Sequence, residues 1–480
     1  MPNNITPPAP ATDSTQIPAA LSSRLRAALR TPAGDGGDLV LSAALRSEHP
    51  ADIAEAMGEM AKPEALAVFN WLDNARAAEV LDEVDADLVH YLLDNAPPGR
   101  IADLLDRLPM DDAAEVVSEA SKEDAEELMA ALHARAPEDA AEVRELLGYG
   151  DQTAGRLMTD KFVRLHIDHT VDQAFQTLRR ASPEVETLTD LYVVETLPYR
   201  KEKLIGLLSL RDLVRAQPTA RIRDIMVKEP ITVGVDTDQE EVARLISKYD
   251  FLAMPVLDRD GCLAGIITID DIVDVLVEEQ TEDVLKQSGI SVEPGVINKP
   301  YFSVPILRVV RSRVGWLVLL FVAETATGVV LRHFESELAK VVALSFFVPL
   351  LIGTGGNTGA QTVSTIIRGI ALKEIRGKDT GRVLVREMIS GVLLGLLLGS
   401  IAFARAMLWH SGPQLSLVVA LTILAICTWA NTIGSMIPLL AQRLKIDPAL
   451  VSAPMINTLV DATGLAIYLT IAKFLLAELR

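Results

Sequence analysis

Apolar residues are distributed along the chain in three patterns, and each pattern predicts a different kind of structure. Over residues 39–148, Ala and Leu alternate with Asp and Glu at helical spacing, which predicts short amphipathic helices. Between residues 154 and 285, apolar runs typical of strands alternate with helical runs. Five apolar segments follow, each reaching or approaching the roughly 20 residues that cross a bilayer. They cover residues 315–331, 341–367, 388–409, 415–440 and 450–476.

The helical part contains a recurring phrase. DIAEAM begins at Asp52, RAAEVL at Arg76, RIADLL at Arg100 and DAAEVV at Asp112. Such repetition predicts stacked short helices, that is, an acidic, all-α superhelical N-terminal domain over residues 38–150. Residues 1–37 are rich in Pro, Thr, Ala and Gly, and we expect them to be disordered apart from a short basic helical run over residues 21–30.

The mixed part is an internal duplication. Residues 206–214 (GLLSLRDLV) overlay residues 265–273 (GIITIDDIV), and LMT at residue 157 corresponds to IMV at residue 225. Residues 151–285 therefore resemble an α/β tandem CBS domain. In that family an S/T-x-x-D step contacts the ribose of an adenine nucleotide, and the step occurs here as Ser209/Asp212 and Thr268/Asp271. ATP is thus a candidate regulator, although the same residues are equally typical of helix N-caps.

The basic residues around the apolar segments predict the orientation. Lys and Arg are concentrated before the first segment, between the second and third, and between the fourth and fifth. Since positive residues favour the cytoplasmic side, we expect a multi-pass protein of the cell (inner) membrane, with its N-terminus cytoplasmic and its C-terminus outside. Residues 286–313 are expected to form a linker or plug helix, and residues 314–480 an α-helical transmembrane domain of five helices. Five helices do not readily enclose a pore, so we expect a homodimer in the lipid bilayer.

The two halves of the chain also differ in net charge. The chain has a net charge of −20, yet from residue 301 onward it carries 16 Lys plus Arg against 9 Asp plus Glu, a net charge of +7. The strongly acidic first half argues against nucleic acid as a partner, because phosphates need Lys and Arg. The acidity suits divalent cations, or it only keeps the domain soluble. Two cysteines in different halves give no disulfide framework and no zinc site.

Two features are unusual at membrane depth. The run PLLIGTGGNTGAQ, residues 349–361, lacks the Lys of a phosphate-binding loop and lies in an apolar context. We interpret it as a broken or closely packed helix whose carbonyls face water. Asp461 lies in the last apolar segment, and an intramembrane carboxylate indicates a functional site. Together they favour a path for a cation, while Glu324 either lines that path or bonds between helices.

Acidic residues are also stacked along residues 270–285. Asp271, Asp274, Glu278 and Glu282 follow one another at i+3 and i+4 spacing, so their like charges repel. Such a helix is either a solvated acidic face or a sensor that takes up cations.

Arranged in this order, the chain from about residue 40 onward resembles the MgtE family of magnesium channels. The most specific motifs are FVPLLIGTGGNTGAQ (residues 347–361), DTDQEEVARLISKYDF (236–251), IDPALVS (446–452) and TLVDATG (458–464). The resemblance implies a homodimer with one Mg²⁺-selective pore, closed by high cytoplasmic Mg²⁺. Ala360 and Ala453 stand where some relatives carry asparagine.

Site residues follow from the resemblance by motif position. It implies a pore Mg²⁺ site at Asp461, Gly353, Gly356, Asn357 and Thr458. It implies regulatory Mg²⁺ sites at Glu79, Asp111, Glu115, Asp238, Glu240, Asp250, Asp271, Asp274, Glu279, Glu282 and Asp283.

Other classes of function stay open at this point. A CBS-regulated transporter of another divalent cation or solute, controlled by adenine nucleotide, is the main alternative. A membrane-anchored sensor that conducts nothing is another. An enzyme is not expected, since the apolar segments hold no Ser/His/Asp constellation.

Overall fold

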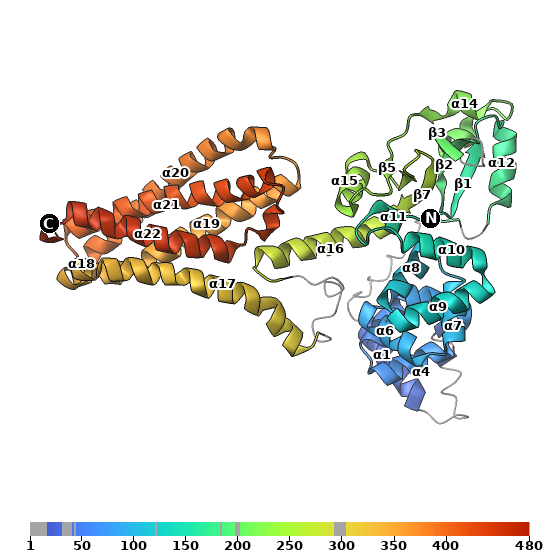
Figure 1. The fold of residues 1–480 in the computed structure, drawn as a ribbon, viewed down its shortest axis with the longest axis horizontal. Helices are drawn as coiled ribbons and strands as arrows, with labels where there is room; N and C mark the ends of the chain where they lie inside the picture. Colours follow the sequence, from blue (N-terminus) through green and yellow to red (C-terminus); the bar gives the residue numbers. More distant parts are fainter. Residues whose placement is uncertain are drawn as a thin grey trace, which may run out of the picture. The chain divides into compact units, whose positions relative to one another are not determined.

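The computed structural model describes residues 17–30, 41–42, 45–120, 122–182, 185–196, 202–291 and 304–479, and it divides into two compact units (Figure 1). The N-terminal unit consists mainly of the chain up to Glu279, and the membrane unit mainly of the chain from Gln280 onward. The division falls within one helix, α16 (Ile269–Gln287).

The first described helix of the N-terminal unit is α1 (Ile17–Arg30). Leu21 and Leu25 lie one turn apart and are each 1% exposed, and Ser22 Oγ donates a hydrogen bond to Glu59 Oε2 at 2.8 Å. The helical run expected over residues 21–30 is thus part of α1, which begins earlier, at Ile17, and the leucine pair gives this helix an apolar stripe to bury. The rest of the segment expected to be disordered, with its boundary at residue 37, lies outside the described residues.

Eight short helices follow, as the repeated phrase predicts. Each packs against the second helix after it, α3 on α5, α5 on α7 and α7 on α9, with α4, α6, α8 and α10 forming the other row. This alternation makes a two-layered superhelix. The helices are α3 (Pro50–Gly58), α4 (Lys62–Trp71), α5 (Asn74–Glu83), α6 (Ala86–Asn95), α7 (Pro98–Leu105), α8 (Met110–Glu119), α9 (Lys122–Arg135) and α10 (Pro137–Leu146).

Local signals explain why these helices stay short. Asp73 and Asp85 cap α5 and α6, where their carboxylates accept hydrogen bonds from Arg76 N and Leu88 N, both at 3.0 Å. Several of the other helices have proline in the first turn, where its missing N–H is not needed. Each new cap therefore starts a new helix before the previous one has exceeded four turns.

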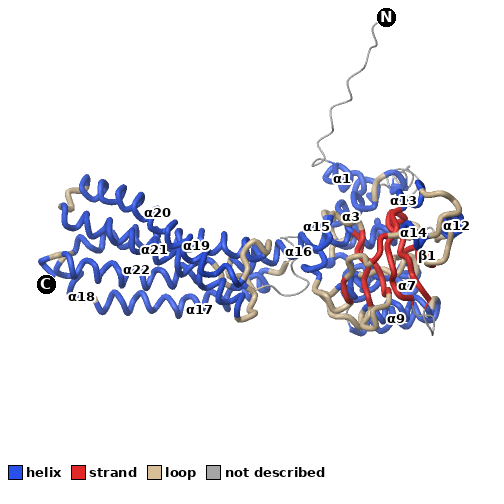
Figure 2. The backbone as a smooth tube through the Cα atoms, turned by 90° about the horizontal axis from the view of Figure 1, so that it is seen from above, coloured by secondary structure: helices blue, strands red, loops and turns tan. Residues whose placement is uncertain are grey.

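The second half of the N-terminal unit contains two sheets (Figure 2). The first has the order β1-β2-β3-β4 and the second the order β5-β6-β7. In both, the first two strands are parallel and the next pair is antiparallel. The strands are β1 (Phe162–His166), β2 (Thr187–Thr196), β3 (Glu202–Ser209), β4 (Val227–Lys228), β5 (Val233–Gly234), β6 (Ala253–Leu257) and β7 (Leu263–Thr268).

Helices complete each repeat in the same order. In the first repeat α12 joins β1 to β2 and α13 follows β3; in the second, α15 joins β5 to β6 and α16 follows β7. The helices are α11 (Ala154–Leu157), α12 (Val171–Arg180), α13 (Leu210–Arg215), α14 (Ile222–Ile225) and α15 (Gln239–Tyr249). The duplication read from the sequence is thus a duplication of structure.

Two glycines lie where the two repeats pack closely against each other. A Cβ at Gly206, in the first repeat, would meet Met226 Sδ at 2.7 Å, and a Cβ at Gly265, in the second, would meet Met158 Cβ at 2.9 Å. Each methionine belongs to the segment that leads into the other repeat. The two lead-in segments are therefore exchanged, and backbone hydrogen bonds between Thr159 and Ile266 (2.8 and 2.9 Å) seal one of the exchanges.

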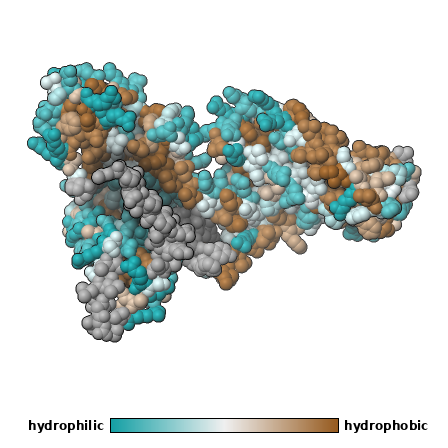
Figure 3. Space-filling view, turned by 180° about the vertical axis from the view of Figure 1, so that it is seen from behind, coloured by the Kyte–Doolittle hydropathy of each residue, from teal (hydrophilic) through white to brown (hydrophobic). Residues whose placement is uncertain are grey.

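The membrane unit has five helices that are long and apolar enough to cross a membrane. They contain α17 (Ile306–His333), α19 (Val348–Ala371), α20 (Thr380–Leu408), α21 (Pro413–Arg443) and α22 (Ala453–Leu475). Short elements connect them: α18 (Glu335–Lys340), η2 (Val342–Phe347), η3 (Gly377–Asp379) and η4 (Pro448–Leu450), and η5 (Ala477–Leu479) follows α22. Apolar side chains cover much of this unit's visible face (Figure 3).

Helix α21 is the centre of the membrane unit and packs against α19, α20 and α22. Small residues allow the close approach. Gly391, Gly395 and Gly399, one turn apart on α20, each leave room for less than a methyl group against the α21 backbone. Helix α17 packs on α22, yet Thr327 is its only buried residue among those described. Most of α17 therefore faces outward, available to lipid or to another subunit.

Candidate functional site

The glycine-rich run predicted as broken or closely packed lies in α19, which is one continuous α-helix from Val348 to Ala371. In a continuous helix each carbonyl accepts the N–H four residues on, so the carbonyls of Gly353 and Gly356 are engaged within the helix. The broken-helix interpretation, with free carbonyls facing water, is therefore wrong. The glycines serve close packing instead: a Cβ at Gly355 would lie 2.6 Å from Ile426 Cγ2.

Helix α19 has two faces of different character. Gly355, Gly356 and Gly359 are buried against α21 and α22. The opposite face is exposed and becomes polar from Asn357 onward, with residues spaced three or four apart. It carries Gly353, Asn357, Gln361, Ser364 and Arg368.

Asp461 lies on α22 beside this contact. Gly359 packs on Ile456, Gly356 on Asn457 and Gly355 on Val460, so the two helices run antiparallel and Asp461 is level with the turn that carries Gly353. The Asp461 side chain is half-buried, and among the described residues its buried Oδ1 has no hydrogen-bond partner. The predicted pore residues Asp461 and Gly353 thus lie at the same depth.

Three further polar residues lie near Asp461, and one of them is also unsatisfied. Asn457, one turn before it on α22, has a buried Oδ1 without a partner in the described chain. Glu324 of α17 interacts electrostatically with Asp461, so this second intramembrane acid lies on the same side of α22. Thr458 Oγ1 instead donates to Pro454 O at 3.1 Å and is satisfied within its own helix. A group of unpaired oxygens at this depth suits a cation that keeps its water shell.

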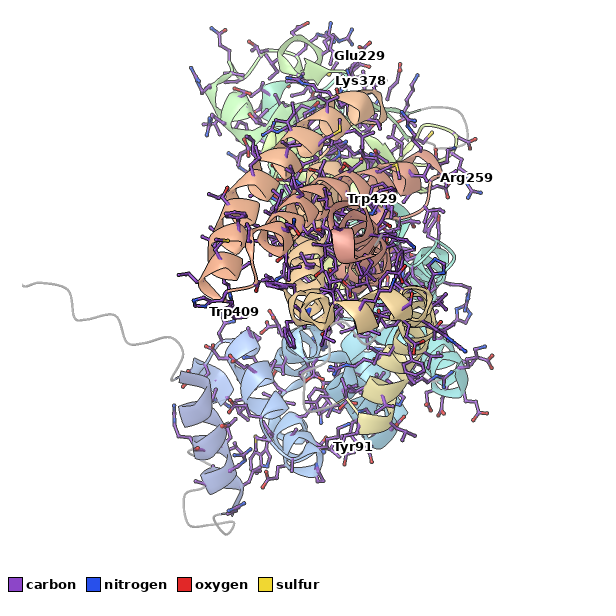
Figure 4. All side chains as sticks on the ribbon, turned by 90° about the vertical axis from the view of Figure 1, so that its left-hand side faces the viewer. Tyr91, Glu229, Arg259, Lys378, Trp409 and Trp429 are labelled. Carbon is purple, nitrogen blue, oxygen red and sulfur yellow. The ribbon has the colours of Figure 1, made fainter. Side chains whose placement is uncertain are left out.

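The cation nearest to Asp461 in its own helix is engaged elsewhere. Lys473 Nζ lies 2.7 Å from Glu337 Oε1, in the connection between α17 and α19. Tyr468 OH donates to Leu344 O at 3.0 Å in the same region. Arg405 lies with its guanidinium carbon 4.6 Å from the centre of the Trp409 ring, at the end of α20 (Figure 4). These contacts close one end of the helix bundle, and no basic partner of Asp461 is found among the residues that the structure describes.

A polar network lies behind the α19 surface. Asn431, 1% exposed on α21, accepts a hydrogen bond from Thr362 Oγ1 at 2.9 Å and donates to Glu387 O at 3.2 Å. It ties α19, α21 and α20 together, and such hydrogen bonds between membrane helices stabilise their association.

The second candidate site is a cluster of carboxylates in the N-terminal unit. Asp82 at the end of α5 and Asp111 and Asp112 at the start of α8 interact electrostatically with Asp271 at the start of α16. Glu115 and Glu186 belong to the same group. Arg156 Nη2 donates to Ala114 O at 2.8 Å and fixes the helical domain against the CBS repeats beside this cluster.

The pKa values of this cluster are raised, chiefly by desolvation and then by mutual repulsion. Burial and the neighbouring Asp111 raise the pKa of Asp112 to about 10. Burial and repulsion by Asp271 raise the pKa of Asp111 well above its ordinary value, and its buried Oδ1 has no hydrogen-bond partner among the described residues. The pKa values of Asp82 and Asp271 rise to about 6 and that of Glu186 to about 7. Assembled carboxylates of this kind need protons or cations.

The remaining predicted regulatory residues occupy other positions. Glu79 pairs with Arg76 on its own helix at 2.9 Å. Asp238 and Asp250 cap the two ends of α15, where Glu240 lies in the first turn. Glu279 Oε1 accepts a hydrogen bond from Gln239 at 2.8 Å. Desolvation raises the pKa of Asp274, with Asp270 as the repelling neighbour.

At its far end, α16 is fastened within the membrane unit. Lys286 Nζ lies 2.8 Å from both Glu282 Oε1 and Asp447 Oδ2, and Asp447 precedes η4 in the connection to α22. Burial and repulsion by Asp447 raise the pKa of Asp283. Trp316 Nε1 of α17 donates to Ser452 Oγ, the N-cap of α22, at 2.9 Å. The end of α16 thus contacts the segment around η4 that leads into α22, the helix that carries Asp461.

The candidate nucleotide residues are helix caps in this structure. Ser209 Oγ donates to Asp212 Oδ2 and Thr268 Oγ1 donates to Asp271 Oδ2, both at 2.7 Å. Asp212 is exposed, whereas Asp271 belongs to the acidic cluster. Only the first pair is therefore open to a ribose.

Sequence reasoning missed three residues of the cluster, Asp82, Asp112 and Glu186. Asp112 follows the predicted Asp111 directly, and two acids in a helix's first turn resemble ordinary N-terminal acids. Nothing in the local sequence separates Asp82 or Glu186 from the many exposed acids of this half, because their neighbours are distant in sequence.

Unpaired charge and a polar helix face at membrane depth are typical of proteins that move ions or solutes, and here they are joined to a large soluble part. The fold and these features thus define a membrane transport protein. Comparison with known families agrees. Residues 348–471 match MgtE, described as a divalent cation transporter; residues 48–152 match the MgtE intracellular N domain; residues 154–219 and 222–278 match the CBS domain. The chain belongs to the MgtE family of divalent cation transporters, and it is not an enzyme.

Relatives extend over most of the chain. The magnesium transporter MgtE of Thermus thermophilus is 39% identical over 456 residues, covering 95% of this chain and 99% of that protein. Its counterpart in Bacillus subtilis is 31% identical over 88% of this chain and 85% of that protein. An inosine-5'-monophosphate dehydrogenase of Helicobacter pylori is 31% identical over only 105 residues, 21% of this chain and 22% of the enzyme. A crystal structure of the cytosolic domain of the Mg²⁺ channel MgtE in complex with ATP covers 53% of this chain and 99% of that one, at 37% identity and a TM-score of 0.49.

Proposed function

We propose that this protein is a Mg²⁺-selective channel or transporter of the cell membrane, gated by cytoplasmic Mg²⁺. The observation that carries the proposal is Asp461, an intramembrane carboxylate with an unpartnered buried oxygen, level with Gly353 on the exposed face of α19. The relatives named magnesium transporters indicate which cation it is.

A hydrated divalent ion explains the chemistry of this region. Mg²⁺ dehydrates reluctantly, so a path for it needs few carboxylates and several groups that bond to water. Asp461 supplies the charge, while Asn357 and the exposed polar residues of α19 supply groups for the water shell. Because the backbone carbonyls of α19 are engaged within the helix, we assign contact with the ion's water to side chains and not to Gly353 or Gly356 carbonyls.

The path requires a second subunit. In one chain the polar face of α19 is exposed, and polar residues at that depth are tolerated only where they are buried in protein or line a water-filled path. A homodimer that brings two such faces together satisfies this condition. The distribution of Lys and Arg between the spans supports a cytoplasmic N-terminus and a C-terminus outside.

The acidic cluster is the proposed sensor. Asp82, Asp111 and Asp112 of the helical domain approach Asp271 only when that domain is packed on the CBS repeats. Divalent cations offset the repulsion in the packed state and bind the separated carboxylates less well, so they favour packing. High cytoplasmic Mg²⁺ is thus expected to stabilise a closed state.

The contacts of Lys286 give this change a route to the pore. Through its pairs with Glu282 and Asp447, movement of α16 acts on the connection that starts α22, the helix of Asp461. Glu282 and Asp283 would add a regulatory Mg²⁺ site at this point, since Asp447 supplies a further carboxylate.

A regulatory role for adenine nucleotide is a second proposal. The exposed Ser209/Asp212 pair has the S/T-x-x-D spacing that contacts ribose in CBS domains. ATP binding there would tune the gate.

Flux measurements in proteoliposomes test the proposal. We expect the reconstituted full-length protein to let Mg²⁺ into the liposomes, where a sealed-in dye reports it. This flux should stop when the solution on the side of the soluble domains contains millimolar Mg²⁺. Flux of another solute with no Mg²⁺ flux would favour the alternative transporter, and absence of all flux would favour a sensor.

A further inference from the structure

The outer side of α20 carries a row of cations at one end. Lys378 precedes the helix in η3, and Arg382 and Arg386 follow at intervals of four residues, so the three side chains lie above one another on one face. All three are exposed. Figure 4 labels Lys378 and Trp409 at opposite ends of α20. In the five-span topology with a cytoplasmic N-terminus, this basic end of α20 is cytoplasmic.

In the described part of the chain, Lys378 and Arg382 have no carboxylate partner, and Arg386 interacts electrostatically with Glu387 without forming an ion pair. No ion pair joins Lys378, Arg382 or Arg386 to an acid there, whereas Lys286 and Lys473 in the same unit are both paired. Of the acids close in sequence, Glu387 lies toward the interior, 3.5 Å from Asn431 Nδ2, and Asp379 accepts a hydrogen bond from Arg376 N at 3.2 Å. Most of the positive charge of the row is therefore left to a partner outside the chain.

The row stands on a folded platform. Ile375 N donates to Gly369 O at 2.9 Å, and the Ile375 side chain packs so close to Gly369 that a Cβ there would lie 2.7 Å from Ile375 Cδ1. Ile375 and Val383 cover a small core made by Ile366, Ile370 and Leu439. The connection between α19 and α20 is thus held against the bundle, and the cations are presented in fixed register.

The same face of α20 becomes apolar further along the helix. Ile389, Leu393 and Leu397 are 56%, 63% and 61% exposed and continue the spacing of the cationic row. They lie opposite Gly391, Gly395 and Gly399, which pack on α21. Arg382 and Leu397 are about 22 Å apart along the axis, at ~1.5 Å per residue. A charged end and a long apolar end on one face match the two ends of a phospholipid.

We infer that the outer face of α20 binds an anionic phospholipid, with its phosphate held by Lys378, Arg382 and Arg386 and its acyl chains along Ile389, Leu393 and Leu397. Basic pockets at the cytoplasmic ends of membrane helices suit anionic head groups. Guanidinium groups bind phosphate through paired hydrogen bonds, so Arg382 and Arg386 fix the head group more firmly than lysine would. A soluble anionic protein would leave the apolar part of this face uncovered.

The test compares two triple variants of the full-length protein with equal loss of charge. K378Q/R382Q/R386Q removes the row, and K203Q/R215Q/K228Q removes three exposed cations of the CBS region. Native mass spectrometry of the purified protein, in micelles containing phosphatidylglycerol or phosphatidylcholine, counts bound lipid. We expect wild type and the CBS variant to retain phosphatidylglycerol in preference to phosphatidylcholine. We expect the row variant to bind phosphatidylglycerol roughly a hundredfold more weakly, since each basic residue near an anionic head group contributes.

Two further measurements keep the inference open to refutation if the row variant does not fold. Raising NaCl from 0.1 to 0.5 M should release phosphatidylglycerol from the wild-type protein and leave phosphatidylcholine unaffected, because the contact is electrostatic. Water-soluble glycerol 3-phosphate should not displace the lipid, since it lacks acyl chains. Equal retention of both lipids by the wild-type protein would overturn the inference. So would a row variant that keeps phosphatidylglycerol but turns from dimer to monomer, because α20 would then face a second copy of the chain.

Discussion

The protein holds carboxylates in two opposite arrangements. In the N-terminal unit Asp82, Asp111, Asp112 and Asp271 crowd together, and burial and then neighbouring acids raise their pKa values. In the membrane unit Asp461 has one acidic neighbour, Glu324, and no basic partner among the described residues. Crowded carboxylates hold a cation firmly and need cations or protons to stay together, which suits a sensor. A nearly lone carboxylate attracts a hydrated ion without trapping it, which suits a path.

Neutralising carboxylates of the acidic cluster in the N-terminal unit is expected to have the largest effect on regulation. D271N/D274N removes the charge that cytoplasmic Mg²⁺ offsets, so flux should continue at millimolar Mg²⁺ where the wild type closes. Patch recordings or liposome flux measure this. D236N, at an exposed acid paired with Arg259 at 3.0 Å, is the matched control and should close normally. Unchanged inhibition in D271N/D274N would count against the sensor.

The packing beside Asp461 is tested by two neighbouring glycines. In G355A the new methyl meets Ile426 and Val460 at 2.6 and 2.8 Å, so we expect a loss of about 1–3 kcal/mol in the free energy of unfolding. G353A is the control, because nothing lies within 4 Å of its new Cβ. Thermal denaturation in detergent should separate the two variants. Equal melting temperatures would mean that α19 does not pack closely on α22.

Removing the ion pairs of Lys286, which connect α16 to the start of α22, should have a smaller effect on regulation by Mg²⁺. K286Q leaves Glu282 and Asp447 without their cation and loosens α16 from the start of α22. A half-buried ion pair of this kind is worth about 1 kcal/mol, so closure should need roughly fivefold more Mg²⁺. K286R keeps the charge and should restore most of the inhibition. An inhibition curve identical to wild type would exclude this route of coupling.

Low pH should partly replace Mg²⁺ in stabilising the packed state of the carboxylate cluster in the N-terminal unit. Of the effects on regulation predicted here, we expect this one to be the smallest. The pKa values of Asp82 and Asp271 are about 6 and that of Glu186 about 7 in the packed state, above the ordinary values near 4. Raised pKa values favour packing at low pH, and this contribution is lost as pH rises through 6 to 7.

Spin labels at the exposed positions Ala75 and Val273 measure this packing without metal. We expect the distance distribution between them to narrow when pH falls from 8 to 6, and Mg²⁺ at pH 8 to narrow it likewise. In D112N/D271N the response to pH should be much weaker. A distribution that widens on acidification would contradict the expected stabilisation of packing by protons.

Features repeated or periodic in sequence were predictable, and features made by distant contacts were not. The duplicated GLLSLRD and GIITIDD segments predict the two repeats, and apolar length predicts the five spans. The continuity of α19 was missed because glycine and threonine weaken a helix locally, whereas packing on Ile426 and Val460 holds it together. Asp82 and Glu186 joined the cluster only through tertiary structure, and the α1 leucines gained significance only once the superhelix gave them a surface to bury on.

The most direct test of the path is Mg²⁺ flux through D461N in proteoliposomes, beside E335Q, which removes an exposed acid from the connection between α17 and α19. Asparagine keeps the shape of Asp461 and removes its charge, so expression and folding should be preserved. We expect flux to fall below detection in D461N and to stay near wild type in E335Q. Normal flux in D461N would show that the ion does not pass beside this carboxylate.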